Sequence, residues 1–317
     1  MRGTLVSACT FLMFCCGCLA TRDVARPTPR SPYVLGLGVA QDGGRPQLGP
    51  QTSAAPDWSD RSVRRFVASL LIVDPVTHQR WLVDATPDIR EQLQEAAGHP
   101  PQRVSPLPVD GVLLTHAHIG HYTGLIHFGR EALGTQGLPV HCSPSMAQFL
   151  SANGPWSLLV KLGNIALKPW APDTPLALTG SLSVTAFSVP HRAEFTDTYG
   201  FMIQGPNRSL LYIPDIDKWE RWDRRVEELI ATSDVALLDG TFFDSDELPG
   251  RDMSEIPHPF IVESLQRFAT LAPKERGKLQ FIHLNHSNPA HDPKSTATRT
   301  IEAAGAHVAF EGEILPL

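Results

Sequence analysis

The most informative absence in this sequence is that of cysteine beyond the N-terminus. Four of the five cysteines (Cys9, Cys15, Cys16 and Cys18) lie within the first 18 residues. Only Cys142 remains in the rest of the chain, so no internal disulfide can form there. The fold must therefore be held by its hydrophobic core and by any metal that it binds.

The sequence also lacks a lysine- or arginine-rich stripe and a low-complexity block. Its 317 residues carry a net charge of −6, and 42% of them are apolar while 19% are charged. A chain of this composition can bury a core, so we expect a packed domain. Nucleic acid is not an expected partner on electrostatic grounds, whereas a small-molecule substrate is.

No apolar run near the N-terminus is long enough to cross a bilayer, which takes about 20 residues. The mostly apolar run 5–14 follows Arg2 and precedes small residues and cysteines, as in an export signal. We therefore read residues 1–18 as a signal peptide. Gly17 and Cys18 resemble the end of a bacterial lipobox, which would make Cys18 a lipidation site; an ordinary cleaved signal is the alternative. The expected location is the periplasm, or the membrane through this lipid anchor alone.

Residues 19–32, which are rich in Pro and Arg toward their end, read as an extended tether. Residues 33–317 read as one catalytic domain in which short apolar strands alternate with helical patterns, which indicates α/β layering. The predicted strands are 33–40, 67–74, 80–84, 112–114, 138–142, 183–189, 199–203, 209–215, 235–239, 279–283 and 307–310. The predicted helices begin near residue 86 or span 124–132, 145–151, 219–231 and 261–271.

Three histidines follow the predicted strand 112–114 directly. His116 and His118 share one side of an extended segment, because alternate residues of a strand face the same way. A turn after them could bring His121 alongside. Neutral imidazole is a good ligand for zinc and iron, so this spacing predicts a metal site.

Further candidate ligands also lie where an apolar strand meets a loop, as a site built on one rim of a sheet requires. Taken singly, most have ordinary explanations; Asp215, for example, could cap a helix. Together they favour a shared site, and His286 is the alternative to His283. The candidates are Asp84, His191, Asp215, Asp239 and His283.

The three histidines match the His-x-His-x-Asp-His signature of the metallo-β-lactamase superfamily, with Gly120 in place of the Asp. The sequence resembles this superfamily from about Tyr33 onward, which implies a four-layer αββα sandwich. Segments 85–90, 237–242 and 282–289 resemble its pyrroloquinoline-quinone biosynthesis protein B branch, which often has an incomplete histidine signature. Because this chain retains all three histidines, the resemblance implies a metal-binding relative of that branch. Segment 40–46 resembles one that borders the metal pocket in close relatives, although its composition alone favours a simple turn.

The resemblance implies a role for each candidate residue. His116, His118 and His191 would hold one metal, His121 and His283 a second, and Asp215 would bridge them, while Asp84 and Asp239 orient ligands from behind. One or two divalent ions are implied, most simply zinc, with iron or manganese as alternatives. Because Gly120 provides no carboxylate, we expect one tight and one weak metal, or a single one.

The resemblance also implies hydrolysis by a metal-bound hydroxide. Asp215 would orient the hydroxide and accept its proton, and His121 would act through the second metal. The expected protein is an exported metal-dependent hydrolase of a small ester, lactone, amide or phosphodiester. A mononuclear iron oxidoreductase of the same fold and a non-catalytic metal-binding lipoprotein are the alternatives.

Overall fold

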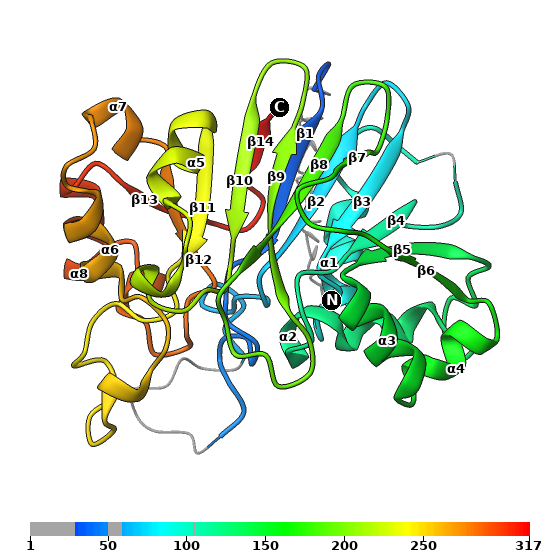
Figure 1. Cartoon of the computed structure of the whole chain (residues 1–317), viewed down its shortest axis with the longest axis horizontal. Helices are drawn as coiled ribbons and strands as arrows, with labels where there is room; N and C mark the ends of the chain where they lie inside the picture. Colours follow the sequence, from blue (N-terminus) through cyan, green and yellow to red (C-terminus); the bar gives the residue numbers. More distant parts are fainter. Residues whose placement is uncertain (1–28, 50–58, 104) are drawn as a thin grey trace, which may run out of the picture.

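The computed structural model describes residues 29–49, 59–103 and 105–317. The proposed signal peptide at residues 1–18, with Cys18, and tether residues 19–28 lie outside the described residues. The described chain forms two seven-stranded mixed sheets that pack face to face, with helices on both outer faces (Figure 1). This is the predicted four-layer αββα sandwich, which is thereby confirmed.

The first sheet has the order β14-β1-β2-β3-β4-β5-β6. Strands β14, β1, β2 and β3 pair antiparallel, and β3 to β6 pair parallel. Because β1 and β3 both run opposite to β2, they run in the same direction as β4. Its strands are β1 (Tyr33–Gly38), β2 (Ser69–Asp74), β3 (Gln79–Val83), β4 (Gly111–Leu113), β5 (Leu138–Cys142), β6 (Ile165–Pro169) and β14 (Ile314–Pro316).

The second sheet has the order β13-β12-β11-β10-β9-β8-β7. Strands β10 to β13 pair parallel, while β7 to β10 pair antiparallel, so β8 runs in the same direction as β10. Its strands are β7 (Pro175–Ala177), β8 (Ser183–Val189), β9 (Thr198–Gln204), β10 (Ser209–Ile213), β11 (Val235–Asp239), β12 (Leu279–Ile282) and β13 (His307–Val308).

Alternation along the strands creates the layers, because successive side chains of a strand point to opposite faces. In β2, Leu70 and Ile72 pack between the two sheets, whereas Leu71 packs under the helices. In β10, Leu210 faces the other sheet and Leu211 faces the helices on its own side. Both faces of each sheet are therefore apolar, as expected for the two central layers of a four-layer sandwich.

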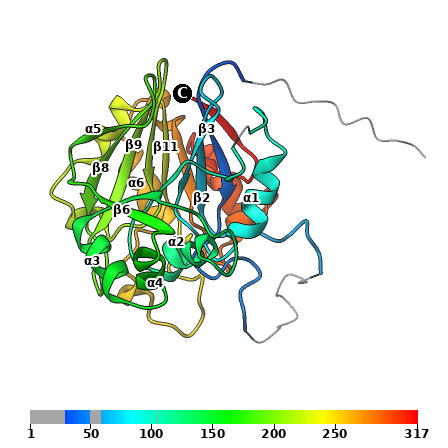
Figure 2. The same ribbon diagram turned by 90° about the vertical axis from the view of Figure 1, so that its right-hand side faces the viewer.

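The helices cover the two outer faces (Figures 1 and 2). Those on the first sheet are α1 (Ile89–Ala97), α2 (Ile119–Tyr122), η1 (Thr123–Phe128), α3 (Pro144–Ala152) and α4 (Trp156–Lys161). Those associated with the second sheet are η2 (Trp219–Arg221), α5 (Val226–Thr232), η3 (Met253–Glu255), α6 (Ile261–Phe268), α7 (Pro273–Arg276), η4 (Pro289–His291) and α8 (Thr296–Ala303). Within the described part of the chain, no helix combines the length and hydropathy needed to traverse a lipid bilayer.

Two predicted helices are wrong in part. Instead of one helix at 124–132, the chain forms α2 and then a 3₁₀ segment, because the backbone N–H of Gly124 donates to Ala85 O at 2.9 Å and holds the turn against the first sheet. Instead of one helix at 219–231, it forms η2 and α5. Between them, Trp222 donates from Nε1 to Ser188 O at 3.1 Å, which holds the segment in an extended conformation.

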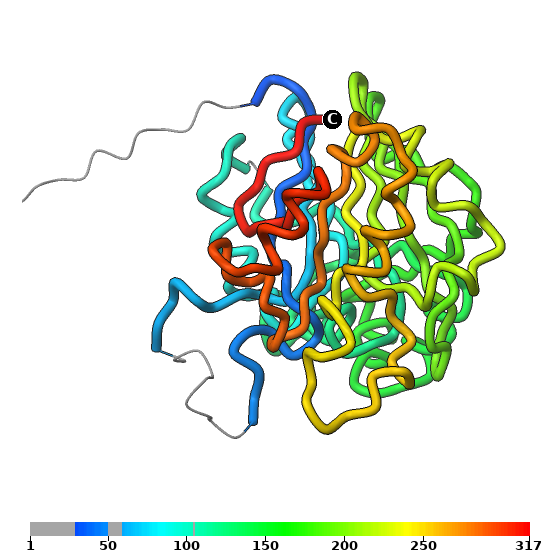
Figure 3. Tube along the Cα trace, turned by 90° about the vertical axis from the view of Figure 1, so that its left-hand side faces the viewer, coloured from blue at the N-terminus to red at the C-terminus, as the bar shows by residue number. Residues whose placement is uncertain are grey.

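Several elements were not predicted, namely α4, β6, β7, α7, α8 and β14. Strand β14 pairs with β1, so the C-terminal end of the chain lies beside its first strand (Figure 3). A three-residue strand is held by this distant partner more than by its own sequence, which explains why the local pattern did not reveal it.

Candidate metal centre

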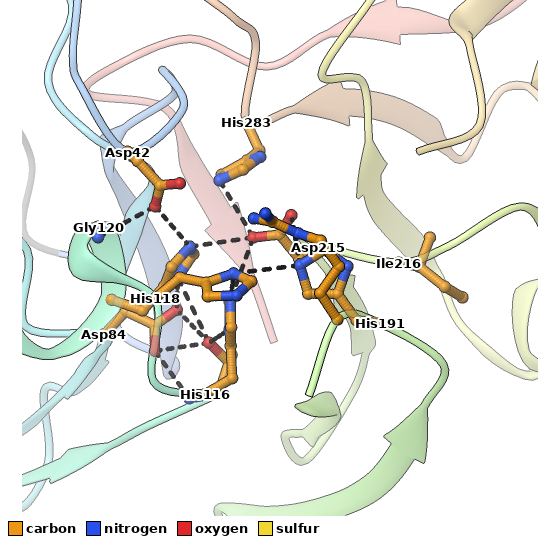
Figure 4. A network of polar contacts seen from close by, with 12 residues as sticks. Asp42, Asp84, His116, His118, Gly120, His191, Asp215, Ile216 and His283 are labelled. Atoms are coloured by element: carbon orange, nitrogen blue, oxygen red, sulfur yellow. Dashed lines mark hydrogen bonds and ion pairs between the residues drawn. The ribbon is translucent and has the colours of Figure 1, made fainter. Parts of the chain in front are cut away.

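The predicted site residues meet at one edge of the sandwich (Figure 4). Each follows the carboxyl end of a strand or is its last residue, and these strands run in the same direction within each sheet. The residues are Asp84 after β3, the histidine cluster after β4, His191 after β8, Asp215 after β10, Asp239 at the end of β11 and His283 after β12. Parallel strand ends meet at a common edge, which is where open α/β sheets bind ligands.

The first group consists of His116, His118 and His191. Nδ1 of His118 lies 2.8 Å from Nε2 of His116 and 3.2 Å from Nε2 of His191. The first two residues follow the first sheet and His191 follows the second, so the two sheets meet here. Three imidazole nitrogens at this spacing form a donor set suited to zinc or another divalent transition metal.

The second group is arranged around Asp215. Its Oδ2 lies 3.0 Å from His121 Nε2, 3.2 Å from His283 Nε2 and 3.6 Å from His116 Nε2, while Oδ1 lies 3.6 Å from His191 Nε2. The carboxylate therefore stands between the two groups, which is the position that a bridging role would require.

Three of these atoms have no hydrogen-bond partner although they are buried, namely Oδ2 of Asp215 and Nε2 of both His121 and His283. Buried polar atoms without partners are costly, and native structures rarely leave several together. A divalent cation would satisfy all three, so the residues present fit a metal. His286 does not join them: it is exposed, and its Nδ1 contacts Asn285 Oδ1 at 3.1 Å.

Four of the five ring nitrogens that point away from the site have a hydrogen-bond partner, and the fifth, His191 Nδ1, lies near Asp217 Oδ1 without a hydrogen bond. Such partners fix the ring orientation of metal-binding histidines. The pairs are His121 Nδ1 with Asp84 Oδ2 at 2.8 Å, His283 Nδ1 with Thr241 Oγ1 at 3.1 Å, His116 Nδ1 with Thr115 Oγ1 at 3.0 Å, His118 Nε2 with Glu194 Oε2 at 3.0 Å and His191 Nδ1 with Asp217 Oδ1 at 3.4 Å.

The backbone is strained at two of these positions. Asp84 and His283 have φ angles of 62° and 63°, in the left-handed region that non-glycine residues rarely enter. Each such residue costs on the order of 1 kcal/mol or more and tends to occur at functional sites. At these positions the chain turns as its strand ends, where Asp84 contacts Thr115 and His121, and His283 contacts Thr241 and Asp215.

The structure adds residues that sequence reasoning missed. Thr115, Thr241 and Glu194 hydrogen-bond to histidine nitrogens on the side away from the site, and Asp217 lies near that of His191. Isolated polar residues in loops gave no signal of this. Asp42 lies with its Oδ1 3.5 Å from His121 Nε2. The sequence did offer one signal that Asp42 lies near the site. The turn that carries it resembles one that borders the metal pocket in close relatives.

His258 was also missed, and it explains the role of Asp239. Its Nδ1 lies 2.8 Å from Asp239 Oδ2 and 3.5 Å from Asp215 Oδ1. Burial lowers the pKa of His258, but Asp239 and Asp215 outweigh it and raise this pKa to about 9. Asp239 thus holds His258 directly, and it reaches His283 only through Thr241, whose Oγ1 donates to Asp239 Oδ1 at 2.7 Å.

Charge in the centre is balanced around Asp215. Burial raises the pKa of this carboxyl, but the nearby His283, His191, His121 and His116 overcome this effect and hold the pKa well below its usual range. Burial likewise lowers the pKa of His116, which keeps that imidazole neutral and able to bind a metal.

Comparison with known proteins agrees with this fold. The family described as "Beta-lactamase superfamily domain" matches residues 79–310, and the chain therefore belongs to the β-lactamase superfamily. Within it, the similarity is to coenzyme PQQ synthesis protein B. The protein of that name from Methylorubrum extorquens (strain PA1) is 30% identical over 311 residues, which cover 90% of this chain and 100% of the relative. The one from Methylobacterium nodulans is 31% identical over 306 residues, covering 89% and 98%.

Solved structures give the same result. Zn(2+)-bound PqqB from Methylobacterium extorquens has a TM-score of 0.76 and 26% identity, covering 90% of this chain and 100% of that one. A diphosphatase from the PhnP family, with a TM-score of 0.63 and 19% identity over 90% and 98% of the chains, shares the fold. The predicted family is thus confirmed.

We predict that Asp84→Asn lowers zinc affinity by about 10- to 100-fold, because His121 loses the charged partner that orients its ring. The measurement is titration with zinc against a chromophoric chelator. Asp74→Asn is the matched control, since Asp74 is a buried acid of the same sheet that accepts from the turn amide of Val76. It should lower stability and leave zinc affinity unchanged. Wild-type affinity in Asp84→Asn would contradict the prediction.

Proposed function

We propose that this protein is a metal-dependent hydrolase that acts on a small ester, lactone, amide or phosphodiester. The observation that carries the proposal is a set of buried potential ligand atoms without hydrogen-bond partners, on His121, His283 and Asp215. A purely structural cluster would satisfy these atoms internally. Zinc is the metal we propose first, because a similar solved structure is a Zn(2+)-bound protein.

When bound, divalent metal ions supply an activated water and an electrophilic contact for the substrate oxygen. The chain's own contribution is positional. Asp215 stays ionised between the two groups, where its two oxygens face different histidines, so it can accept a hydrogen bond from the water and orient it. Hydrogen bonds on the side away from the site limit the rotation of four of the five imidazoles.

His258 is the side chain we assign to the leaving group. It is buried beside Asp215, is not one of the predicted ligands, and is fixed by Asp239 at 2.8 Å. A histidine in this position can give a proton to a departing alkoxide or amine.

Two exposed apolar residues that are neighbours of site residues in the chain support a substrate with an apolar portion. Ile119 and Phe195 are 60% and 62% exposed and directly follow His118 and its partner Glu194. Phe195 also packs against Phe149, with ring centroids 5.2 Å apart. Exposed apolar side chains next to a centre of buried polar groups are typical of a small-molecule site. We therefore place esters and lactones first among the substrates.

We predict that zinc- or manganese-loaded protein hydrolyses chromogenic esters or bis-phosphodiesters, and that Asp215→Asn lowers this turnover by about 100-fold or more, with a far smaller change in stability. Hydrolysis and dioxygen consumption are measured with zinc-, manganese- and iron-loaded protein. Dioxygen consumption by the iron form without hydrolysis would favour the iron oxidoreductase. Metal binding without either reaction would favour the non-catalytic lipoprotein.

We predict that His258→Gln slows hydrolysis of alkyl esters by about 100-fold, whereas esters of acidic phenols, whose leaving groups need no proton, are hardly affected. Zinc content should stay at the wild-type value. Equal losses for both ester types would refute the assignment, and a loss of zinc would make His258 a ligand, as its grouping with His191 and Asp215 allows.

We also propose that the protein is exported and carries a lipid on Cys18, which the sequence pattern of residues 1–18 supports. Cells producing the full chain should incorporate a palmitate analogue into the wild type and not into Cys18→Ala. Absence of label from the wild type would leave an ordinary cleaved signal peptide as the alternative.

A further inference from the structure

Gly120 occupies a position with no room for a side chain. A Cβ atom there would lie 2.2 Å from Asp42 Oδ1 and 2.7 Å from Asp42 Cα. The backbone of Gly120 does not have a positive φ, so conformational freedom is not what requires glycine here. Glycine is required because the side chain of Asp42 already fills this space.

Asp42 places its carboxylate where the histidine signature would otherwise place one. Its Oδ1 accepts a hydrogen bond from the backbone N–H of Gly120 at 3.0 Å and lies 3.5 Å from His121 Nε2 (Figure 4). Ligand atoms of Asp42, His121 and His283 lie within 4.8 Å of one another. The two imidazoles are fully buried, and their Nε2 atoms have no hydrogen-bond partner.

The turn that carries Asp42 is attached to the segment that carries His283. The backbone N–H of Gln41 donates to Leu284 O at 2.8 Å, and that of Leu284 donates to Val39 O at 2.8 Å. Asp42 and His283 are therefore held in fixed relation, although they are far apart in the sequence. A preorganised acid of this kind loses little freedom when it binds a cation.

We propose that Asp42 is the acidic ligand of the second metal, and that Asp42 and Gly120 are an exchanged pair: the acid has moved from the histidine signature to the turn after β1. The inference rests on the metal centre proposed above. It also reverses the expectation of a weak second metal, which assumed that no acid replaces the one missing at Gly120.

The test measures zinc retained by the full-length protein after dialysis, together with zinc affinity by competition with a chromophoric chelator. Wild type should retain about two zinc ions per chain, and Asp42→Ala and Asp42→Asn about one. Gly120→Asp alone should also lose zinc, because the new side chain collides with Asp42. The double variant Asp42→Ala/Gly120→Asp should regain the second ion. Asp60→Ala is the control, because Asp60 is an exposed acid whose Oδ1 accepts from the backbone N–H of Ser62 at 2.9 Å, and this variant should retain both ions.

The outcomes separate this inference from the proposed function. If wild type retains two ions and Asp42→Ala retains both with unchanged affinity, the exchange is wrong and the metal centre stands. The exchange is likewise wrong, and the metal centre stands, if wild type retains a single ion. This is also the conclusion if the double variant binds zinc no more tightly than Asp42→Ala. If wild type retains no zinc, both proposals fail. Thermal unfolding of each variant shows whether it is folded. If Gly120→Asp does not fold, the zinc content of Asp42→Asn decides the test, because this variant keeps the shape of the side chain.

Discussion

The centre depends on one buried charge, the carboxylate of Asp215. Its side chain is 2% exposed, and removing an ion from water is costly unless partners compensate. Here the compensation comes from imidazoles contributed by both sheets, which hold the pKa of the carboxyl well below its usual range. A set of buried groups that balance each other in this way adds little net stability, so stability alone does not explain why these groups are buried together.

The surrounding residues serve to keep these imidazoles in place. Two similar acid–threonine pairs lie at the edge of the sandwich, one following each sheet: Asp84 with Thr115, and Asp239 with Thr241. In both, an acid after or at the end of a strand binds a threonine hydroxyl that contacts a histidine of the site. The left-handed backbone at Asp84 and His283 lies in the same two regions. Local strain and buried hydrogen bonds are thus concentrated where the side chains must be aimed accurately.

Much of the site could be predicted because its residues follow strands whose apolar patterns are strong, as at Ile213 before Asp215 and Ile282 before His283. The fold followed from the family resemblance and from the same strands. Asp42 could not be identified as a ligand because a Gln-Asp-Gly-Gly turn looks the same with or without a partner 78 residues away. The helical pattern at 219–231 gave a wrong prediction of one continuous helix, because Trp222 donates to the carbonyl of the distant Ser188. Strand β14 was missed because it forms through its pairing with β1.

Both groups of donors take members from the two sheets: His116 and His191 in one, Asp42 and His283 in the other. The described residues contain one cysteine, Cys142, so no covalent bond joins the sheets there. An ion bound by either group would link the two sheets along this edge and oppose any sliding of one sheet over the other. Loss of the ion would then lower the stability of the sandwich as well as the hydrolytic activity proposed above.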